Sequence, residues 1–155
     1  MTLPIHSPTA SPTTSPRSST PGALAAGGPI ERAVLSRFGN ALAIYAFGSQ
    51  VQGGAGPESD LDLAVLVPGY APPLGLWELS GALADIAGCP VDLMDLRAAS
   101  TVMQYQIITK GRCIWSVGLE AGLFESFVLS EMTDLNAARA GLLQDIQRDG
   151  RIHVR

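Results

Sequence analysis

The chain has 155 residues, of which 46% are hydrophobic and 15% charged, and its formal net charge is −4. This length predicts one domain with one modest core, and the acidic balance argues against direct nucleic-acid binding, which usually comes with a basic face or a high pI. Because no apolar run approaches the roughly 18 residues that span a bilayer, and the N-terminus lacks a charged segment followed by an apolar one, we expect a cytoplasmic protein.

The first 21 residues differ in composition from the rest. They are almost all Ser, Thr, Pro and small residues, and such a segment cannot bury enough apolar surface to offset the entropy cost of ordering it. We therefore expect a disordered tail over residues 1–21 and a single domain over residues 22–150.

From residue 22 onward, helical and strand patterns alternate along the chain. Apolar residues at helical spacing predict helices over 30–38, 73–88 and 98–109. Short apolar runs rich in strand-forming residues predict strands over 41–47, 61–67, 90–96 and 112–117. This alternation predicts an α/β (α+β) fold with one small sheet flanked by helices.

A long amphipathic helix is predicted over residues 122–148. Its apolar residues step by three or four positions: Phe124, Val128, Met132, Leu135, Ala138, Leu142 and Ile146. One interpretation is that this stripe packs on the sheet. The other is that part of it forms an interface with a partner, because the helix is long for so small a core.

The two cysteines, Cys89 and Cys113, do not have the CxxC spacing of a redox or metal motif. No other residue type near them in the sequence completes such a site. We therefore expect both to be reduced, buried thiols.

The stretch AFGSQVQGGAGPESDLDLAVLV, residues 46–67, is rich in glycine. Gly48 and Gly53 have the glycine spacing of a Walker phosphate loop, but Gly54 follows where that loop needs lysine, so this motif is excluded. A GxSxG nucleophile elbow is also missing around Ser49, and the globular part has no histidine before His153. A Ser-His-Asp hydrolase is therefore disfavoured.

Two aspartates, Asp60 and Asp62, begin the second apolar run. Residues two apart on a strand point to the same face, so their carboxylates lie side by side and repel each other. Such a pair makes sense where a divalent cation neutralises it, and carboxylate oxygens suit Mg²⁺ or Mn²⁺. The alternative is that the pair only marks the exposed start of the strand.

Gly48 and Ser49 lie at the end of the preceding strand. A glycine there allows a phosphate to approach the backbone closely, and the N–H groups of Ser49, Gln50 and Val51, at a helix N-terminus, can hold a triphosphate. The Ser49 hydroxyl is then a hydrogen-bond donor to phosphate and not a nucleophile.

A third carboxylate is available in the strand over 90–96. Asp92 lies between Val91 and Leu93, where a buried charge is costly unless it is paired or bound to a metal. Asp95 is more easily a residue of the strand end or of the following turn. Asp92 is therefore the better candidate to join Asp60 and Asp62.

Gly48-Ser49, ten residues, and then Asp60-Leu61-Asp62 fit the GSx10DxD signature of the nucleotidyltransferase superfamily. The chain resembles in particular the minimal nucleotidyltransferases (MNT) of prokaryotic HEPN–MNT toxin–antitoxin pairs. The segments that carry this resemblance are YAFGS, SDLDLAVLV, VDLMDL and KGRCIWS, and the likeness covers roughly residues 30–150.

The resemblance implies a polymerase-beta-like nucleotidyltransferase fold with a small mixed sheet. It implies transfer of AMP from ATP to a hydroxyl, typically of a tyrosine, on a HEPN ribonuclease toxin, which silences the toxin. By the same resemblance, Gly48 and Ser49 hold the triphosphate. The three metal ligands for Mg²⁺ or Mn²⁺ are Asp60, Asp62 and Asp92, and the last also helps to activate the acceptor hydroxyl.

One residue departs from the family pattern. Family members often have a basic residue shortly after the Gly-Ser pair, and this chain has Gln52 there. Arg97, Lys110 and Arg112 are candidates to supply the missing positive charge, although each also fits a surface role.

Two alternatives to the enzymatic antitoxin stay open: an antitoxin that blocks the toxin by binding alone, and a nucleotidyltransferase that modifies a small molecule.

Overall fold

A four-stranded sheet with the strand order β3-β2-β1-β4 forms the centre of the computed structural model, which describes residues 20–53 and 59–149. The strands are β1 (Ala43–Phe47), β2 (Leu61–Leu66), β3 (Val91–Asp95) and β4 (Arg112–Ser116). β1 runs antiparallel to both β2 and β4, whereas β2 and β3 are parallel. The expected small mixed sheet is confirmed, and each strand lies within its predicted range.

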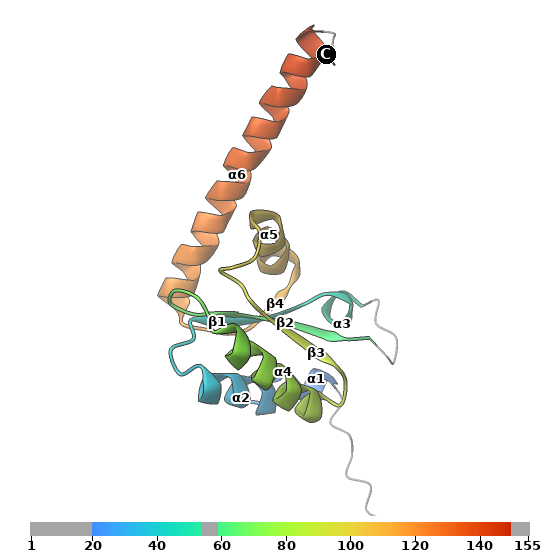
Figure 1. Cartoon of the computed structure of the whole chain (residues 1–155), viewed down its shortest axis with the longest axis vertical. Helices are drawn as coiled ribbons and strands as arrows, with labels where there is room; N and C mark the ends of the chain where they lie inside the picture. The colour runs from blue at the N-terminus through green and yellow to red at the C-terminus, as the bar shows by residue number, and fades with distance from the viewer. Residues whose placement is uncertain (1–19, 54–58, 150–155) are drawn as a thin grey trace, which may run out of the picture.

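Helices cover both faces of this sheet (Figure 1). The helices are α1 (Thr20–Ala23), α2 (Pro29–Arg37), α3 (Ser49–Gln52), α4 (Pro73–Ala87), α5 (Thr101–Lys110) and α6 (Gly118–Asp149). α1, α2 and α4 lie against one face, and α5 lies with the start of α6 against the other. Residues 1–19 of the predicted tail lie outside the described residues. The last two residues of that tail, 20 and 21, belong to α1.

α5 begins three residues later than its sequence pattern predicted, at Thr101 and not at residue 98. The Ser100 hydroxyl accepts a hydrogen bond from the Met103 N–H at 3.2 Å, which is the usual arrangement of a helix N-cap. The two residues before Ser100 form a turn that bonds back to the end of β3, through Ala98 N–H to Asp95 O and Ala99 N–H to Leu96 O. The cap and the turn together determine where α5 begins.

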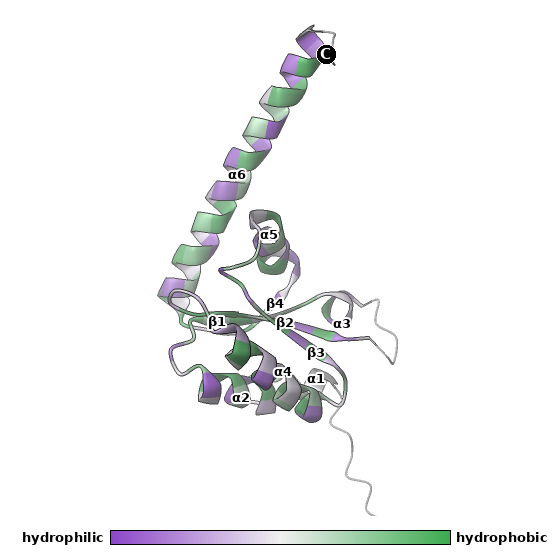
Figure 2. Ribbon diagram, viewed as in Figure 1, coloured by the Kyte–Doolittle hydropathy of each residue, from purple (hydrophilic) through white to green (hydrophobic). Residues whose placement is uncertain are grey.

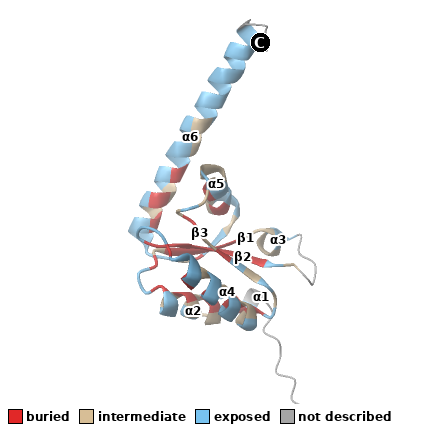
Figure 3. Ribbon diagram, in the orientation of Figure 1, coloured by how far each residue is buried: buried red, intermediate tan, exposed pale blue. Residues whose placement is uncertain are grey.

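Alternation along the strands divides the core into two clusters, one on each face of the sheet. Ile44, Leu63 and Leu93 point toward α2 and α4, whereas Tyr45 and Ala64 point toward α5 and α6. The two inner strands, β1 and β2, are the most completely buried part of the sheet (Figure 3). A strand residue next to one that is buried under α4 therefore faces α5, and this alternation determines the direction of the polar side chains described below.

The first turns of α6 are bound to the sheet. Phe124 and Val128 are buried there, and the Tyr45 hydroxyl donates a hydrogen bond to Glu125 Oε1 at 2.6 Å. Burial, and then this bond to a carboxylate, raise the pKa of Tyr45, so the phenol keeps its proton and remains the donor. The Arg97 guanidinium lies over the Phe124 ring at 5.2 Å from its centroid, a cation–π contact.

The outer half of α6 extends away from the domain (Figure 1). Leu142, Leu143 and Ile146 are 61%, 59% and 41% exposed. The interpretation that the whole stripe packs on the sheet is therefore wrong for this half. The reason is length, because a helix of 32 residues is about 48 Å long and a strand of six residues only about 20 Å. Apolar residues nevertheless continue along this part of the helix (Figure 2).

Across the described residues, no helix is long and apolar enough to cross a membrane.

Candidate active site

The candidate site lies where β1 ends and where β2 and β3 begin. In the sheet register Phe47 pairs with Asp62, and Asp62 pairs with Asp92. Gly48 directly follows β1 and leads into α3. Segments that are far apart in the sequence are thus brought together at one end of the sheet, and they carry the Gly-Ser pair and the three candidate carboxylates.

Gly48 is in close contact with the carboxylate of Asp62. Its φ is +80°, in the left-handed region that side chains disfavour. A Cβ added at this position would lie 2.3 Å from Asp62 Oδ2. Both the backbone conformation and the nearby carboxylate therefore require glycine, and the Asp62 side chain lies directly against the backbone of the turn.

The three aspartates are close enough to influence each other electrostatically. Asp62 points toward α5, because its neighbours Leu61 and Leu63 are buried on the α4 side. Burial raises the pKa of the Asp62 carboxyl, and the negative charges of Asp92 and Asp60 raise it further. A cation placed among these carboxylates would relieve both their repulsion and the cost of desolvating Asp62.

The chemistry of these donors fits Mg²⁺ or Mn²⁺, both of which prefer carboxylate oxygens. Across the described residues, however, no three acidic, histidine or cysteine side chains already converge as a metal-binding group. The register brings Asp60, Asp62 and Asp92 to the same end of the sheet, and their side chains would have to turn toward a shared ion. Asp92 is exposed, so the expectation that it is buried is wrong. The cause is its place on β3, an edge strand.

Asp95 has a structural role at the other end of β3. It is only 7% exposed, and its carboxylate accepts hydrogen bonds from Ala71 N–H at 2.8 Å and from Arg97 N–H at 3.0 Å. These bonds satisfy a buried charge and hold the loop before α4 against the strand end. Asp95 is thus the strand-end residue that its sequence position indicated.

α3 has only four residues, so its macrodipole is small and the phosphate donors there are individual backbone groups. The Val51 N–H already donates to Gly48 O at 3.1 Å, which removes one of the three N–H groups assigned to phosphate. The N–H groups of Ser49 and Gln50 open the helix, where a helix offers no acceptor of its own. They are the donors that remain for a ligand.

The side chain of Gln50 is used to position the loop before β2. Its Nε2 donates to Ser59 O at 2.6 Å and lies 3.9 Å from Cys89 Sγ. Ser59 directly precedes Asp60, so this bond links the turn after β1 to the start of the carboxylate pair. The backbone N–H of Gln50 remains available to a ligand, while its side-chain nitrogen holds Ser59 next to the turn.

A cavity of about 260 Å³ lies between the Gly48 turn and α5. On one side it is lined by Phe47, Gly48, Gln52 and Asp62, and on the other by Met103, Gln106 and Ile107. The α5 residues could not be predicted from the sequence, because Met and Gln carry no chemical signature and lie about 40 residues beyond Asp62. The exposure of Met103, at 38%, is unusual for a large apolar side chain and becomes visible only in the structure.

The other residues considered in the sequence lie outside this cavity. Arg97 Nε donates to Val67 O at 3.3 Å, near the far end of β2, so it does not replace the positive charge that Gln52 lacks. Lys110 and Arg112 are exposed. Cys89 is half-buried, whereas Cys113 is exposed, so the expected burial is wrong for Cys113. Its strand, β4, is the other edge of the sheet.

Known proteins resemble this chain in sequence and structure. The profile of the family described as "Polymerase beta, Nucleotidyltransferase" matches residues 32–117. The chain is 38% identical over 103 residues to the protein adenylyltransferase MntA of Shewanella oneidensis, which covers 66% of this chain and 74% of MntA. It is also similar to a chain of a toxin–antitoxin crystal structure with AMP-PNP (TM-score 0.67, 34% identity, 76% of this chain and 95% of the other). A further match is to a chain of the complex between tri-AMPylated Shewanella oneidensis HEPN toxin and MNT antitoxin (TM-score 0.62, 31% identity, 76% and 92%).

Proposed function

The chain belongs to the polymerase beta nucleotidyltransferase family, and we propose that it transfers AMP from ATP to a tyrosine hydroxyl of a HEPN-type toxin and thereby neutralises the toxin. The observation that carries this proposal is the pairing of Asp62 with Asp92, next to the contact between Asp62 and Gly48. This arrangement places acidic groups beside a turn that offers backbone N–H donors. The relatives described above, which are named as an adenylyltransferase and as antitoxins bound to toxins, support the choice of nucleotide and partner.

Each site residue has a role in this proposal. The triphosphate accepts hydrogen bonds from the backbone N–H groups of Ser49 and Gln50 and from the Ser49 hydroxyl. Because Gly48 has no side chain, the triphosphate can approach the backbone closely. Asp60, Asp62 and Asp92 would hold Mg²⁺ or Mn²⁺, which supplies positive charge that neutralises the triphosphate and acidifies the acceptor hydroxyl. Asp92, which is exposed and therefore within reach of an acceptor, accepts the hydroxyl proton. The acceptor oxygen then bonds to the α-phosphorus, and the bond to the leaving pyrophosphate breaks.

A labelling experiment tests this function. The purified chain is mixed with α-labelled ATP and a purified HEPN-type partner, in Mg²⁺, in Mn²⁺ and in EDTA. We expect label on the partner with either metal and none in EDTA. The absence of label on the partner in both metals contradicts the proposal. Label on a small molecule without any partner supports the small-molecule alternative instead.

The outer half of α6 favours a second contribution to neutralisation, which is binding itself. Leu142 and Ile146 continue the helix face whose earlier members, Phe124 and Val128, are buried in the domain. An apolar helix face left in solvent is typical of a surface that another protein covers. We infer that the HEPN-type partner packs on this half of α6, which would also keep the acceptor close to the enzyme.

Charges on this face are expected to weaken the complex. For Leu142→Glu with Ile146→Glu we expect at least about tenfold weaker binding of the partner, since the two side chains lose apolar burial and bring charge into the interface. Binding is measured by calorimetry. The matched control, Gln144→Glu with Gln147→Glu, adds the same charge to the other faces of the helix. Equal affinity of the two double variants contradicts this interface, provided that their melting temperatures match the unmodified chain.

Gln52 offers a test of the missing basic residue. It lines the cavity together with Gly48 and Asp62, so a cation at this position lies near the phosphates. For Gln52→Arg we expect roughly a two- to tenfold lower KM for ATP, because guanidinium and phosphate form strong charge-assisted hydrogen bonds. Gln52→Met is the uncharged control of similar size. If the arginine and methionine variants have the same KM, this position does not contact the triphosphate.

A further inference from the structure

The wall that α5 contributes to the cavity beside Gly48 takes no part in the proposed chemistry. Met103, Gln106 and Ile107 line it, and residues three and four apart on a helix share a face. Ile107 is buried in the core, whereas Met103 and Gln106 are exposed. α5 thus presents an apolar side chain and an amide to the space between itself and the Gly48 turn.

We propose that this wall binds the base of the nucleotide. Gln106 is a specificity-determining residue that hydrogen-bonds to the N6–N7 edge of adenine, and Met103 packs against the adenine ring. The inference rests on the proposed function and adds which part of the nucleotide α5 recognises. The flexible, polarisable side chain of methionine makes favourable contacts with aromatic rings.

The cavity has the size and the lining for part of a nucleotide. Its volume of about 260 Å³ lies below the roughly 300–1,000 Å³ of sites that enclose a whole drug-sized ligand. The Gly48 turn and Asp62, where phosphate and metal are proposed to bind, lie on the side opposite α5. Among the described residues that line the cavity none is cationic, so the α5 wall offers a phosphate no charge partner and suits an uncharged ring.

The amide of Gln106 has no hydrogen bond to any of the described residues. Gln104, two positions earlier, is buried, and its Nε2 donates to Leu96 O at 3.0 Å. This bond and the burial of Ile107 hold α5 against the sheet, so the helix positions Gln106 while leaving its amide unused. Both the NH₂ donors and the C=O acceptor of Gln106 therefore remain for a ligand.

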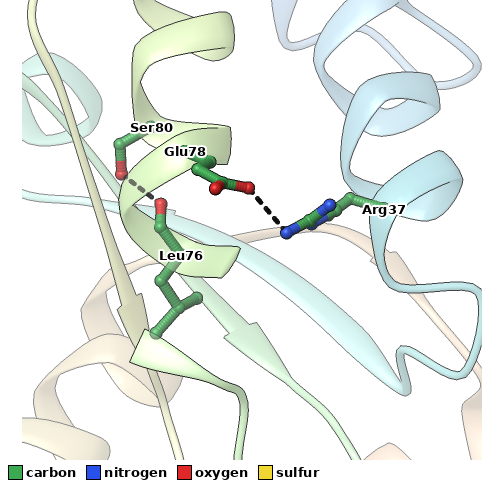
Figure 4. Close-up of polar contacts among 4 residues, drawn as sticks. All are labelled: Arg37, Leu76, Glu78 and Ser80. Carbon is green, nitrogen blue, oxygen red and sulfur yellow. Dashed lines mark hydrogen bonds and ion pairs between the residues drawn. The ribbon is translucent and has the colours of Figure 1, made fainter. Parts of the chain in front are cut away.

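Polar side chains of α4, on the opposite face of the sheet, show a different arrangement. Glu78 Oε2 accepts a hydrogen bond from Arg37 Nη2 of α2 at 2.8 Å, and the Ser80 hydroxyl donates to Leu76 O at 2.8 Å. Figure 4 shows Glu78 directed toward Arg37 and Ser80 bonded back to its own helix. These groups are bound within the domain, whereas the Gln106 amide borders a cavity and is open to a ligand.

The donor and acceptor of a glutamine amide match one edge of adenine. On that edge the N6 amine donates and the neighbouring N7 accepts, and glutamine is a common bidentate partner for this pair. The same edge of guanine carries two acceptors, O6 and N7, so the amide can pair with only one of them. Contact with Gln106 along this edge therefore favours ATP over GTP.

The test measures binding of the α,β-methylene analogues of ATP and GTP, which cannot release AMP or GMP, to the full chain in Mg²⁺ by calorimetry. For Gln106→Leu we expect at least about threefold weaker binding of the ATP analogue and less than about twofold change for the GTP analogue. Met103→Ala should weaken both by about three- to tenfold, because apolar packing does not distinguish the two bases. The matched control, Gln144→Leu on the exposed outer half of α6, should bind both like the unmodified chain.

The outcomes separate the base site from the function itself. If the unmodified chain binds the ATP analogue but labels no partner with labelled ATP, the proposed function fails and the base site stands. If Gln106→Leu binds both analogues like the unmodified chain, or loses affinity for both equally, Gln106 does not read the base. An unmodified chain that binds neither analogue would also overturn the assignment. So would a Gln106→Leu variant that raises KM for the partner at unchanged nucleotide affinity, since it would give the cavity to the acceptor.

Discussion

Replacing Asp60 and Asp62 together by asparagine is expected to reduce AMP transfer to the partner by at least about 10³-fold, because removing charge stabilisation from a transfer site costs rates of this order. Asparagine keeps the size of each side chain and removes the negative charge that would bind Mg²⁺ or Mn²⁺. The measurement is label on the partner per minute at saturating ATP. Complex formation with the partner should be unchanged, since the outer half of α6 extends away from the sheet at whose end these residues lie (Figure 1).

Stability separates loss of chemistry from loss of folding in this variant. Burial and, after it, repulsion from Asp92 and Asp60 raise the pKa of Asp62. Both costs of holding a charge there fall when the carboxylates are replaced, so the free protein should melt at the same or a higher temperature than the unmodified chain. Asp85→Asn removes the charge of an exposed carboxylate on α4 and should leave the transfer rate unchanged. Transfer by the double variant at the rate of the Asp85→Asn control would show that these two aspartates are not metal ligands.

The second large effect is expected for Gly48→Ala, which should abolish measurable transfer and destabilise the protein by about 1–3 kcal/mol. An alanine at this position has to keep the unfavourable φ of +80°, and its methyl group collides with Asp62 Oδ2. Relief of this collision requires either the turn or the carboxylate to move. Both belong to the proposed site, so the nucleotide and metal contacts are displaced together. Thermal unfolding and the labelling assay measure the two effects.

Gly69→Ala is the matched control for the cost of placing alanine at a positive φ. Gly69 has a φ of +72°, and a Cβ there would meet no atom within 4 Å. Its substitution therefore brings the cost of a positive φ, about 1 kcal/mol, without a collision. We expect Gly69→Ala to retain transfer. If Gly48→Ala behaves like this control in both stability and activity, the contact between Gly48 and Asp62 has no functional role.

The family and the main elements of the fold could be predicted from local patterns. The GSx10DxD spacing, with an apolar run before and after it, was sufficient to indicate a nucleotidyltransferase, and the match to that family confirms the resemblance. Short apolar runs predicted ranges that contain the four observed strands. Such features depend on residues that are neighbours in the sequence, and their chemistry is visible without knowledge of the packing.

Exposure at the edges of the fold could not be predicted in this way. Asp92 was interpreted as a buried charge because it lies between two apolar residues, and Cys113 as a buried thiol because the sequence offers it no metal or redox partner. Each lies on an edge strand and is exposed. The α6 stripe has the same spacing in both halves, and only its first half meets the sheet. Whether an apolar residue is covered depends on how far the rest of the domain reaches, which no local pattern records.

The chemical groups of the site can thus be read from local sequence: a glycine that allows close approach, donors that follow it, and two aspartates two residues apart at the start of a strand. How these groups meet depends on the packing of the whole domain. Strand register set Asp92, and not Asp95, opposite Asp62. Packing of α5 against the sheet formed the cavity beside Gln52. Register and helix packing minimise the exposed apolar area of the whole domain, and that area is a sum over residues far apart in the chain.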